Sequence, residues 1–150
     1  MPNNPMDNPD RLMIRYRSGL GNVGSYQASS IPFLSSSIPL TSGDPPTYIG
    51  FPKVSKFITI KNTVSPASAS APLKFGFSSY GVGFPGGPIA NTGSNYIELA
   101  NGESFSGDFR VAGVFLQASG SDCNASVAAG LTMIDAGELP YNWSGSLGVG

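Results

Sequence analysis

The chain has no histidine, a single cysteine and only 11% charged residues. Histidine is the side chain whose unperturbed pKa lies closest to neutral pH, and without it neither a Ser-His-Asp nor a Cys-His catalytic arrangement can be built. Cys123 cannot form a disulfide within its own chain. We expect a small buried or half-buried thiol there, with an intermolecular disulfide or a reactive thiol as alternatives. The composition predicts a protein that is not an enzyme and holds no cofactor or metal.

Excess charge and long apolar runs are also missing. The net charge is −1, and only Arg11, Arg15 and Arg17 form a basic cluster. Nucleic-acid-binding domains normally carry a basic stripe, so we expect no direct contact with nucleic acid. No apolar run approaches the roughly 20 residues that span a bilayer. The opening residues MPNNPMDNPDR contain no apolar signal segment, so we expect neither a membrane span nor a secretory route.

Glycine and proline are abundant, with 20 and 13 copies. They interrupt every stretch that could otherwise show helical spacing of apolar residues, whereas period-2 alternation is clear in several short segments. Asn101-Gly102 supplies a hairpin-type turn signal. Short strands separated by Gly, Pro, Ser and Asn turns predict an all-β sandwich or barrel. The expected strand segments are 55–63, 73–79, 95–100, 104–111, 113–119 and 125–134.

The first fifty residues follow a different pattern. Residues 11–17 (RLMIRYR) could form a short strand, and residues 18–42 contain no charge but many scattered apolar groups. We predict an extended arm over residues 1–50, a core over 51–135, and a tail over 136–150 that packs on the core or a neighbour. The arm is expected to be buried against a neighbouring subunit or against its own domain. The candidate interface residues are Arg15, Arg17, Tyr26, Phe33, Leu34, Ile38, Tyr141 and Trp143.

Three motifs suggest chemistry but lack the context it needs. Gly19–Gly24 and Gly81–Gly86 match G-x-G-x-x-G, yet neither opens a helix that could hold a pyrophosphate. Glu98 and Glu103 flank the Asn-Gly turn, where a solvated hairpin end is a better account than a catalytic carboxylate pair. Asp122 and Asn124 offer oxygen atoms to calcium without a complete cage. We predict no nucleotide, metal or catalytic site at these positions.

An aromatic platform for sugar binding is an alternative function. Most aromatic residues occupy alternating strand positions, where core packing is the default. Tyr80, Phe84 and Tyr96 border a long Gly/Pro loop and are the candidates for exposure, together with Trp143. A carbohydrate-binding attachment module therefore stays open beside a structural role.

The strand pattern, together with the lead-in GNVGSYQASSIPFLSSSIPL, resembles the penton (vertex) proteins of large icosahedral double-stranded DNA viruses. The resemblance covers roughly residues 12–135. It implies a single jelly roll of about eight antiparallel strands with an extended N-terminal arm. It also implies a homopentamer at each fivefold vertex of the virion capsid, next to major or minor capsid proteins and assembled inside the host cell. Head-decoration and tail-surface proteins of phages share such a pattern and remain alternatives.

Overall fold

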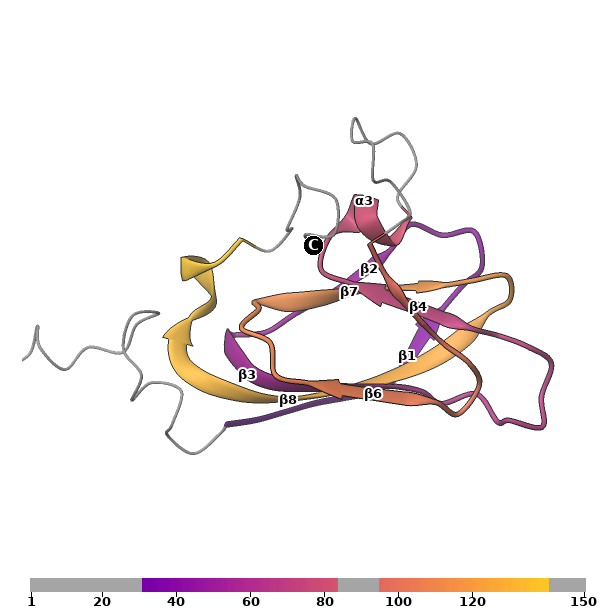
Figure 1. Ribbon diagram of the computed structural model, residues 1–150, viewed down its shortest axis with the longest axis horizontal. Helices are drawn as coiled ribbons and strands as arrows, with labels where there is room; N and C mark the ends of the chain where they lie inside the picture. The colour runs from indigo at the N-terminus through magenta and orange to yellow at the C-terminus, as the bar shows by residue number, and fades with distance from the viewer. Residues whose placement is uncertain (1–30, 84–94, 141–150) are drawn as a thin grey trace, which may run out of the picture.

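Eight strands account for most of the residues that the structure describes. The computed structural model describes residues 31–83 and 95–140. Besides the strands, this part of the chain has one helical turn, α3 (Ser79–Val82), and one 3-10 turn, η2 (Ala136–Glu138). The prediction of an all-β fold is confirmed (Figure 1). The strands are β1 (Ile31–Leu40), β2 (Thr47–Gly50), β3 (Lys53–Asn62), β4 (Leu73–Gly76), β5 (Ile97–Leu99), β6 (Ser104–Gly107), β7 (Gly113–Ala118) and β8 (Cys123–Asp135).

The strands form two four-stranded antiparallel sheets that face each other as a β-sandwich. Sheet A has the order β1-β8-β3-β6, and sheet B has the order β2-β7-β4-β5. Figure 1 shows sheet A as the lower layer and sheet B as the upper layer. The first strand pairs with the last, β2 with β7, β3 with β6 and β4 with β5. The first half of the chain is thus paired with the second half in reverse order.

Alternating residues of both sheets fill the space between them. Ile58 and Ile60 of β3 point inward, while Phe57 and Thr59 point outward, as their period-2 spacing predicts. Leu73 and Phe75 of β4 share the inner face in the same way. The core is completed by Val114 and Leu116 of β7 and by Val127, Ala129 and Leu131 of β8.

The alternation of side chains breaks down near the C-terminal end of β8. Alternation puts Met133 on the same face as Val127 and Leu131, but its side chain is 55% exposed. The pairing of β3 with β8 shifts register here, because Lys53 lies opposite Asp135 while Ser55 lies opposite Leu131. Four residues of β8 therefore lie opposite two residues of β3. A bulge of this kind interrupts the alternation of side chains, so the period-2 rule fails beyond Leu131.

Residues 31–50 are not part of an arm. They form β1 in sheet A and β2 in sheet B, and Ile38 and Leu40 lie in the core of their own chain. The expected boundary at residue 50 is therefore corrected for this stretch. Residues 1–30 of the expected arm and residues 141–150 of the expected tail lie outside the described residues, whereas residues 136–138 form η2.

A β-bulge explains why β1 escapes the sequence pattern. Phe33 and Ser35 face inward before it, and Ile38 and Leu40 face inward after it. The register with β8 shifts between Ser35 and Ile38, and Ser37 adopts a positive φ of 56°. The extra residue shifts the alternation by one position, so the inward residues of β1 do not follow a single period-2 pattern in the sequence.

The Asn101-Gly102 signal produces a turn but not a hairpin. The amide of Glu103 donates to the carbonyl of Ala100 at 3.0 Å, and Gly102 has a positive φ of 77°. The strands on either side, β5 and β6, belong to different sheets. The turn therefore forms a corner of the sandwich, and the expectation of a hairpin end is corrected.

Matched leucine substitutions test the placement of β1. Leu40 is 4% exposed and Leu34 on the same strand is 80% exposed. We expect Leu40→Ala to lower the free energy of unfolding by about 2–5 kcal/mol through lost burial and a residual cavity. Leu34→Ala should change it by less than about 0.5 kcal/mol. Urea unfolding of both variants measures the difference, and equal small effects would contradict a core position for β1.

Candidate interaction surfaces

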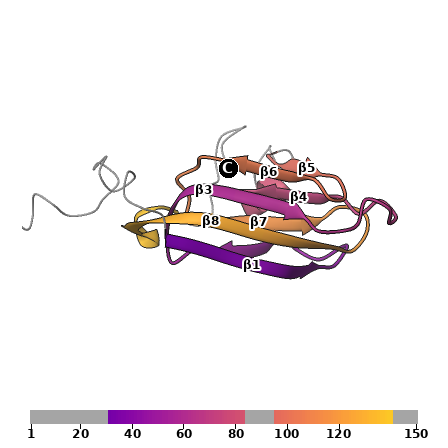
Figure 2. The same ribbon diagram turned by 90° about the horizontal axis from the view of Figure 1, so that it is seen from below.

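The outer face of sheet A is exposed and nearly uncharged. Figure 2 views this side, on which β6, β3, β8 and β1 lie next to one another. In the part of β1, β3, β6 and β8 where the side chains alternate regularly, Lys61 is the one charged residue that points outward. The Thr59 and Ser106 hydroxyls are 2.9 Å apart on this surface. We call this surface the sheet A face; its residues are Pro32, Leu34, Ser36, Phe57, Thr59, Lys61, Ser104, Ser106, Asn124, Ser126, Ala128 and Gly130.

A shallow groove runs along β8 in the middle of the sheet A face. Its volume is about 280 Å³, with Leu34 and Ser36 on one side and Thr59 and Lys61 on the other. Ala128 lies opposite both Leu34 and Thr59, so it forms the floor of the groove. The hollow exists because the outward residues of β8 are small while those of β1 and β3 are larger.

Exposed large apolar side chains gather on sheet A. Among the described residues, Leu34, Phe57 and Met133 are 80%, 39% and 55% exposed, and Ile31 is exposed at the start of β1. Phe57 lies opposite Gly130. The remaining exposed large apolar residue of the described ranges, Ile97, belongs to sheet B. Apolar exposure concentrated on one sheet is typical of an interaction surface.

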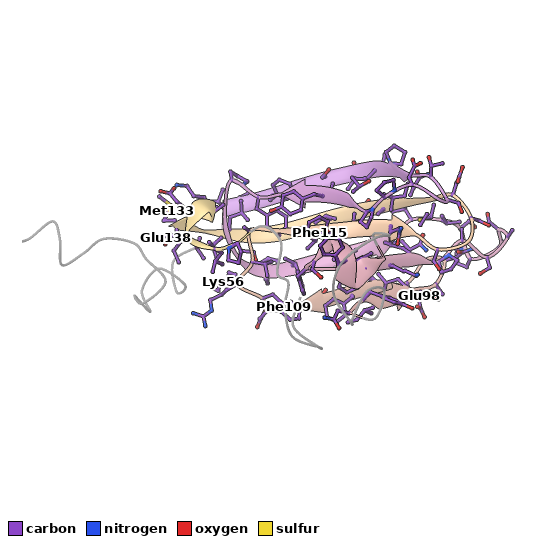
Figure 3. All side chains as sticks on the ribbon, turned by 90° about the horizontal axis from the view of Figure 1, so that it is seen from above. Lys56, Glu98, Phe109, Phe115, Met133 and Glu138 are labelled. Carbon is purple, nitrogen blue, oxygen red and sulfur yellow. The ribbon has the colours of Figure 1, made fainter. Side chains whose placement is uncertain are left out.

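The outer face of sheet B is different, because it is partly covered by its own chain. Phe115 of β7 points outward but is only 5% exposed. Its ring lies 4.8 Å from the Tyr48 ring, and Figure 3 shows it beside α3. Val82 of α3 is fully buried, and a Cβ at Gly76 would lie only 2.7 Å from its Cγ2 atom. The missing side chain at Gly76 lets α3 pack closely on sheet B.

Three of the predicted interface residues are described by the structure, and they lie in different environments. Leu34 is exposed on the sheet A face, as an interface residue would be. Ile38 lies in the core of its own chain, and Phe33 packs edge-to-face on Phe51 with ring centroids 4.9 Å apart. The expected interface role of Ile38 and Phe33 is corrected. Phe33 faces inward before the bulge in β1, and the bulge turns Ile38 inward after it. The other predicted interface residues lie outside the described ranges: Arg15, Arg17, Tyr26, Tyr141 and Trp143.

Four connections meet at one end of the sandwich, which we call the four-loop end: residues 41–46, 63–72, 100–103 and 119–122 (Figure 1). Asn101 holds two of these connections together. Its side-chain amide donates to the Ala69 carbonyl at 2.8 Å, and its side-chain oxygen accepts from the Ala71 amide at 2.9 Å. The carboxylate of Asp122 accepts from the Ser42 amide at 2.7 Å. The loops at this end are fixed to one another by hydrogen bonds.

Asn62 anchors the same end from within the core. Its side-chain amide donates to the carbonyls of Ala71 and Leu99 at 2.9 and 3.2 Å. Its side-chain oxygen accepts from the Val64 amide at 3.1 Å. A buried asparagine with all these groups paired specifies one arrangement of the surrounding backbone. Alternation places Asn62 on the same face as Ile58 and Ile60, but its role as an anchor was missed because a polar side chain at the end of a strand gives no sign of burial.

Cys123 is a buried core residue, as its expected role as a small thiol requires. Burial, and secondarily the Asp122 carboxylate, raise the pKa of the Cys123 thiol. The reactive form of cysteine is the thiolate, so both burial and the raised pKa make this group inert in the folded chain.

The motifs that suggested chemistry have structural roles where they are described. The Glu103 carboxylate accepts from the Ala100 amide at 2.9 Å, and Glu98 lies opposite Lys74 on the neighbouring strand. Gly81 and Gly83 belong to α3 and its C-cap, while residues 19–24 and 84–86 of the two glycine motifs lie outside the described residues. No cluster of three or more potential metal ligands occurs among residues 31–83 and 95–140.

The aromatic residues considered for sugar binding do not form an open platform within the described ranges. Tyr80 and Tyr96 are half-buried, and Phe84 and Trp143 lie outside the described residues. The ammonium group of Lys74 lies 4.6 Å from the centroid of the Tyr96 ring. One face of that ring is therefore already engaged by a cation.

No helix in the described part of the chain has the length and apolar character to cross a membrane. No protein-family model, curated protein or solved structure matches this chain.

Replacing Asn62 tests the anchor at the four-loop end. Asn62→Ala removes the partners of two carbonyls and one amide, and each buried unpaired group costs about 1–3 kcal/mol. We expect a loss of at least about 2 kcal/mol of unfolding free energy. Asn124→Ala, at an exposed position of β8, is the matched control and should change stability by less than about 0.5 kcal/mol. Equal effects in thermal or urea unfolding would contradict the anchoring role.

Cys123 makes stability depend on pH in a defined direction. The unfolded thiol ionises near its ordinary pKa of 9.0, whereas the folded thiol keeps its proton to higher pH. The stabilising difference is fully present below pH 9 and is lost above it, because the unfolded state then binds fewer protons. Unfolding free energy should therefore fall more steeply above pH 9 in the native chain than in Cys123→Ala. Parallel pH profiles, or rapid labelling of the folded chain by a thiol reagent, would contradict this account.

Proposed function

We propose that this chain is a structural protein of an icosahedral viral shell, in which five copies form a ring at the fivefold vertex. It works by presenting fixed surfaces to other copies and to neighbouring capsid proteins, without catalysis or a cofactor. The observation that supports it most strongly is the order of strand pairing. The fixed loops of the four-loop end and the low surface charge give further support.

The strand pairing supports a jelly roll as the specific form of the sandwich. The pairs β1–β8 and β3–β6 lie in sheet A, and β2–β7 and β4–β5 lie in sheet B. A single long antiparallel hairpin gives this arrangement when it is wrapped so that successive strand pairs enter alternate sheets. Eight-stranded jelly rolls of two sheets are used in viral capsid and lectin domains. Fold alone does not establish function, so the surfaces carry the rest of the proposal.

The four-loop end suits close packing around a symmetry axis. Its loops are held to one another through Asn62, Asn101 and the Ser42–Asp122 contact. Copies that meet repeatedly in one geometry need surfaces whose shape does not vary, and ordered loops lose little entropy on association. A closed ring also needs a heterologous contact, in which two different surface patches of neighbouring copies meet.

The low surface charge supports association with identical copies. Copies with a large net charge repel one another at short range, while a net charge of −1 in 150 residues keeps that repulsion small. The carbohydrate-binding alternative has less support, because Tyr80 and Tyr96 are half-buried and Lys74 covers part of the Tyr96 ring.

Native mass spectrometry of the purified chain tests the proposed assembly. We expect a species of five times the chain mass that grows with protein concentration and dissociates at low concentration. A matched analysis of denatured protein gives the mass of one chain. A monomer at every concentration up to several hundred micromolar, or assemblies that contain no multiple of five chains, would contradict a fivefold role.

A further inference from the structure

The edges of both sheets are poorly suited to strand addition. The edge strands β2, β5 and β6 have only four, three and four residues. The long edge strand β1 contains Pro32 and Pro39, and the bulge at Ser37 interrupts it. Short edges, prolines and bulges all oppose edge-to-edge pairing. Self-association of the described part of the chain is therefore more favourable through a sheet face.

We propose that the sheet A face packs on the same face of a second copy, with Leu34 of each copy in the groove of the other. The contact is isologous, because the same surface is used by both copies. It goes beyond the fivefold ring, whose contacts must be heterologous, and it would pair two chains whether or not they belong to rings.

The Leu34 side chain and the groove that would receive the Leu34 side chain of a second copy lie next to each other on the sheet A face. Leu34 is 80% exposed and forms one wall of the groove whose floor is Ala128. The groove holds about 280 Å³, and an apolar cavity of about 150 Å³ already accommodates benzene. An aliphatic side chain therefore fits. A twofold axis that lies in the contact brings each Leu34 to the groove of its partner, so a second copy fills both grooves at once.

Charge points to the same occupant. Lys61, the one charged side chain of the sheet A face, forms part of the groove wall toward the four-loop end, opposite Ser104 and Ser126 of the neighbouring strands. Beyond this face, at the other end of β3 and β8, Lys53 and Asp135 neutralise each other in an ion pair at 2.6 Å. A twofold axis that lies in the contact and crosses β8 obliquely near Ala128 carries the two lysines to opposite ends, so they do not repel each other closely. A strongly charged partner would find few counter-charges on this face, whereas an identical face matches its neutral, apolar and hydroxyl character.

The area is sufficient for a specific but weak pair. The outer surface of sheet A consists of three strands of ten residues or more and of β6 with four residues. At about 3.3 Å per residue and about 4.8 Å between strands, this surface covers roughly 540 Å² on each copy. Two copies would bury about 1,100 Å², which is close to the lower limit of specific interfaces. We expect a dissociation constant in the micromolar range or weaker.

Sedimentation velocity over a concentration series tests the pair, with Leu34→Lys as the central variant. Leu34 is exposed, so this substitution leaves the core intact. We expect it to weaken pairing at least tenfold. Ala128→Gln, which fills the floor of the groove, should do the same. Ile97→Lys is the matched control, because Ile97 is 44% exposed on sheet B and should pair like the native chain.

Each outcome separates this contact from the proposed fivefold role. Pairs that disappear in Leu34→Lys and persist in Ile97→Lys support the contact, even if no ring forms. Rings of five that persist in Leu34→Lys, without even-numbered species in the native chain, overturn the contact and leave the fivefold role standing. A native chain that shows no pairing at several hundred micromolar overturns the contact and leaves the sheet A face for a different protein.

Discussion

The pairing of the first described strand with the last is the constraint on which the rest of the sandwich depends. β8 is the longest described strand and lies between β1 and β3, so it joins the beginning and the middle of the domain in one sheet. β1 contacts β8 over residues separated by about eighty to one hundred positions, as in Ile31–Leu131 and Leu40–Cys123. Such contacts carry a large loop-closure cost, which must be met before the pairing stabilises the fold. The interior is consequently a property of the whole domain.

The same strand also determines the outer surface. Inward residues of β8, such as Val127 and Leu131, fill the core, while its outward residues Ser126, Ala128 and Gly130 are small. Small outward residues on a central strand leave a groove between the larger side chains of β1 and β3. β8 thus supplies core residues on its inner side and, on its outer side, the floor of the groove that we assign to a second copy. Within the described residues, sheet B lacks an equivalent bare surface, because α3 packs closely over Gly76.

The fold class could be predicted from sequence, but several details of the site could not. Period-2 alternation in β3 and β4 identifies their buried faces directly, since Ile58 and Ile60 of β3 and Leu73 and Phe75 of β4 are apolar at alternating positions. The buried face of β1 could not be identified in this way, because a bulge at Ser36 and Ser37 interrupts the alternation. The sequence alone does not show which residue is left out of the strand pairing. The Asn101-Gly102 signal locates a turn but not the sheets of its flanking strands, which depend on contacts across the sandwich. Asn62 could be identified as an anchor only after Ala71 and Leu99 were known to meet around it.

The central claim is that this protein acts through surfaces that it offers to its own copies. Electron cryomicroscopy of the chain purified at high concentration, at a resolution that shows side chains, tests it most directly. The account predicts a closed assembly in which Leu34 and the groove over Ala128 are buried against a neighbouring copy. Single chains with the sheet A face open to solvent at that concentration would contradict it.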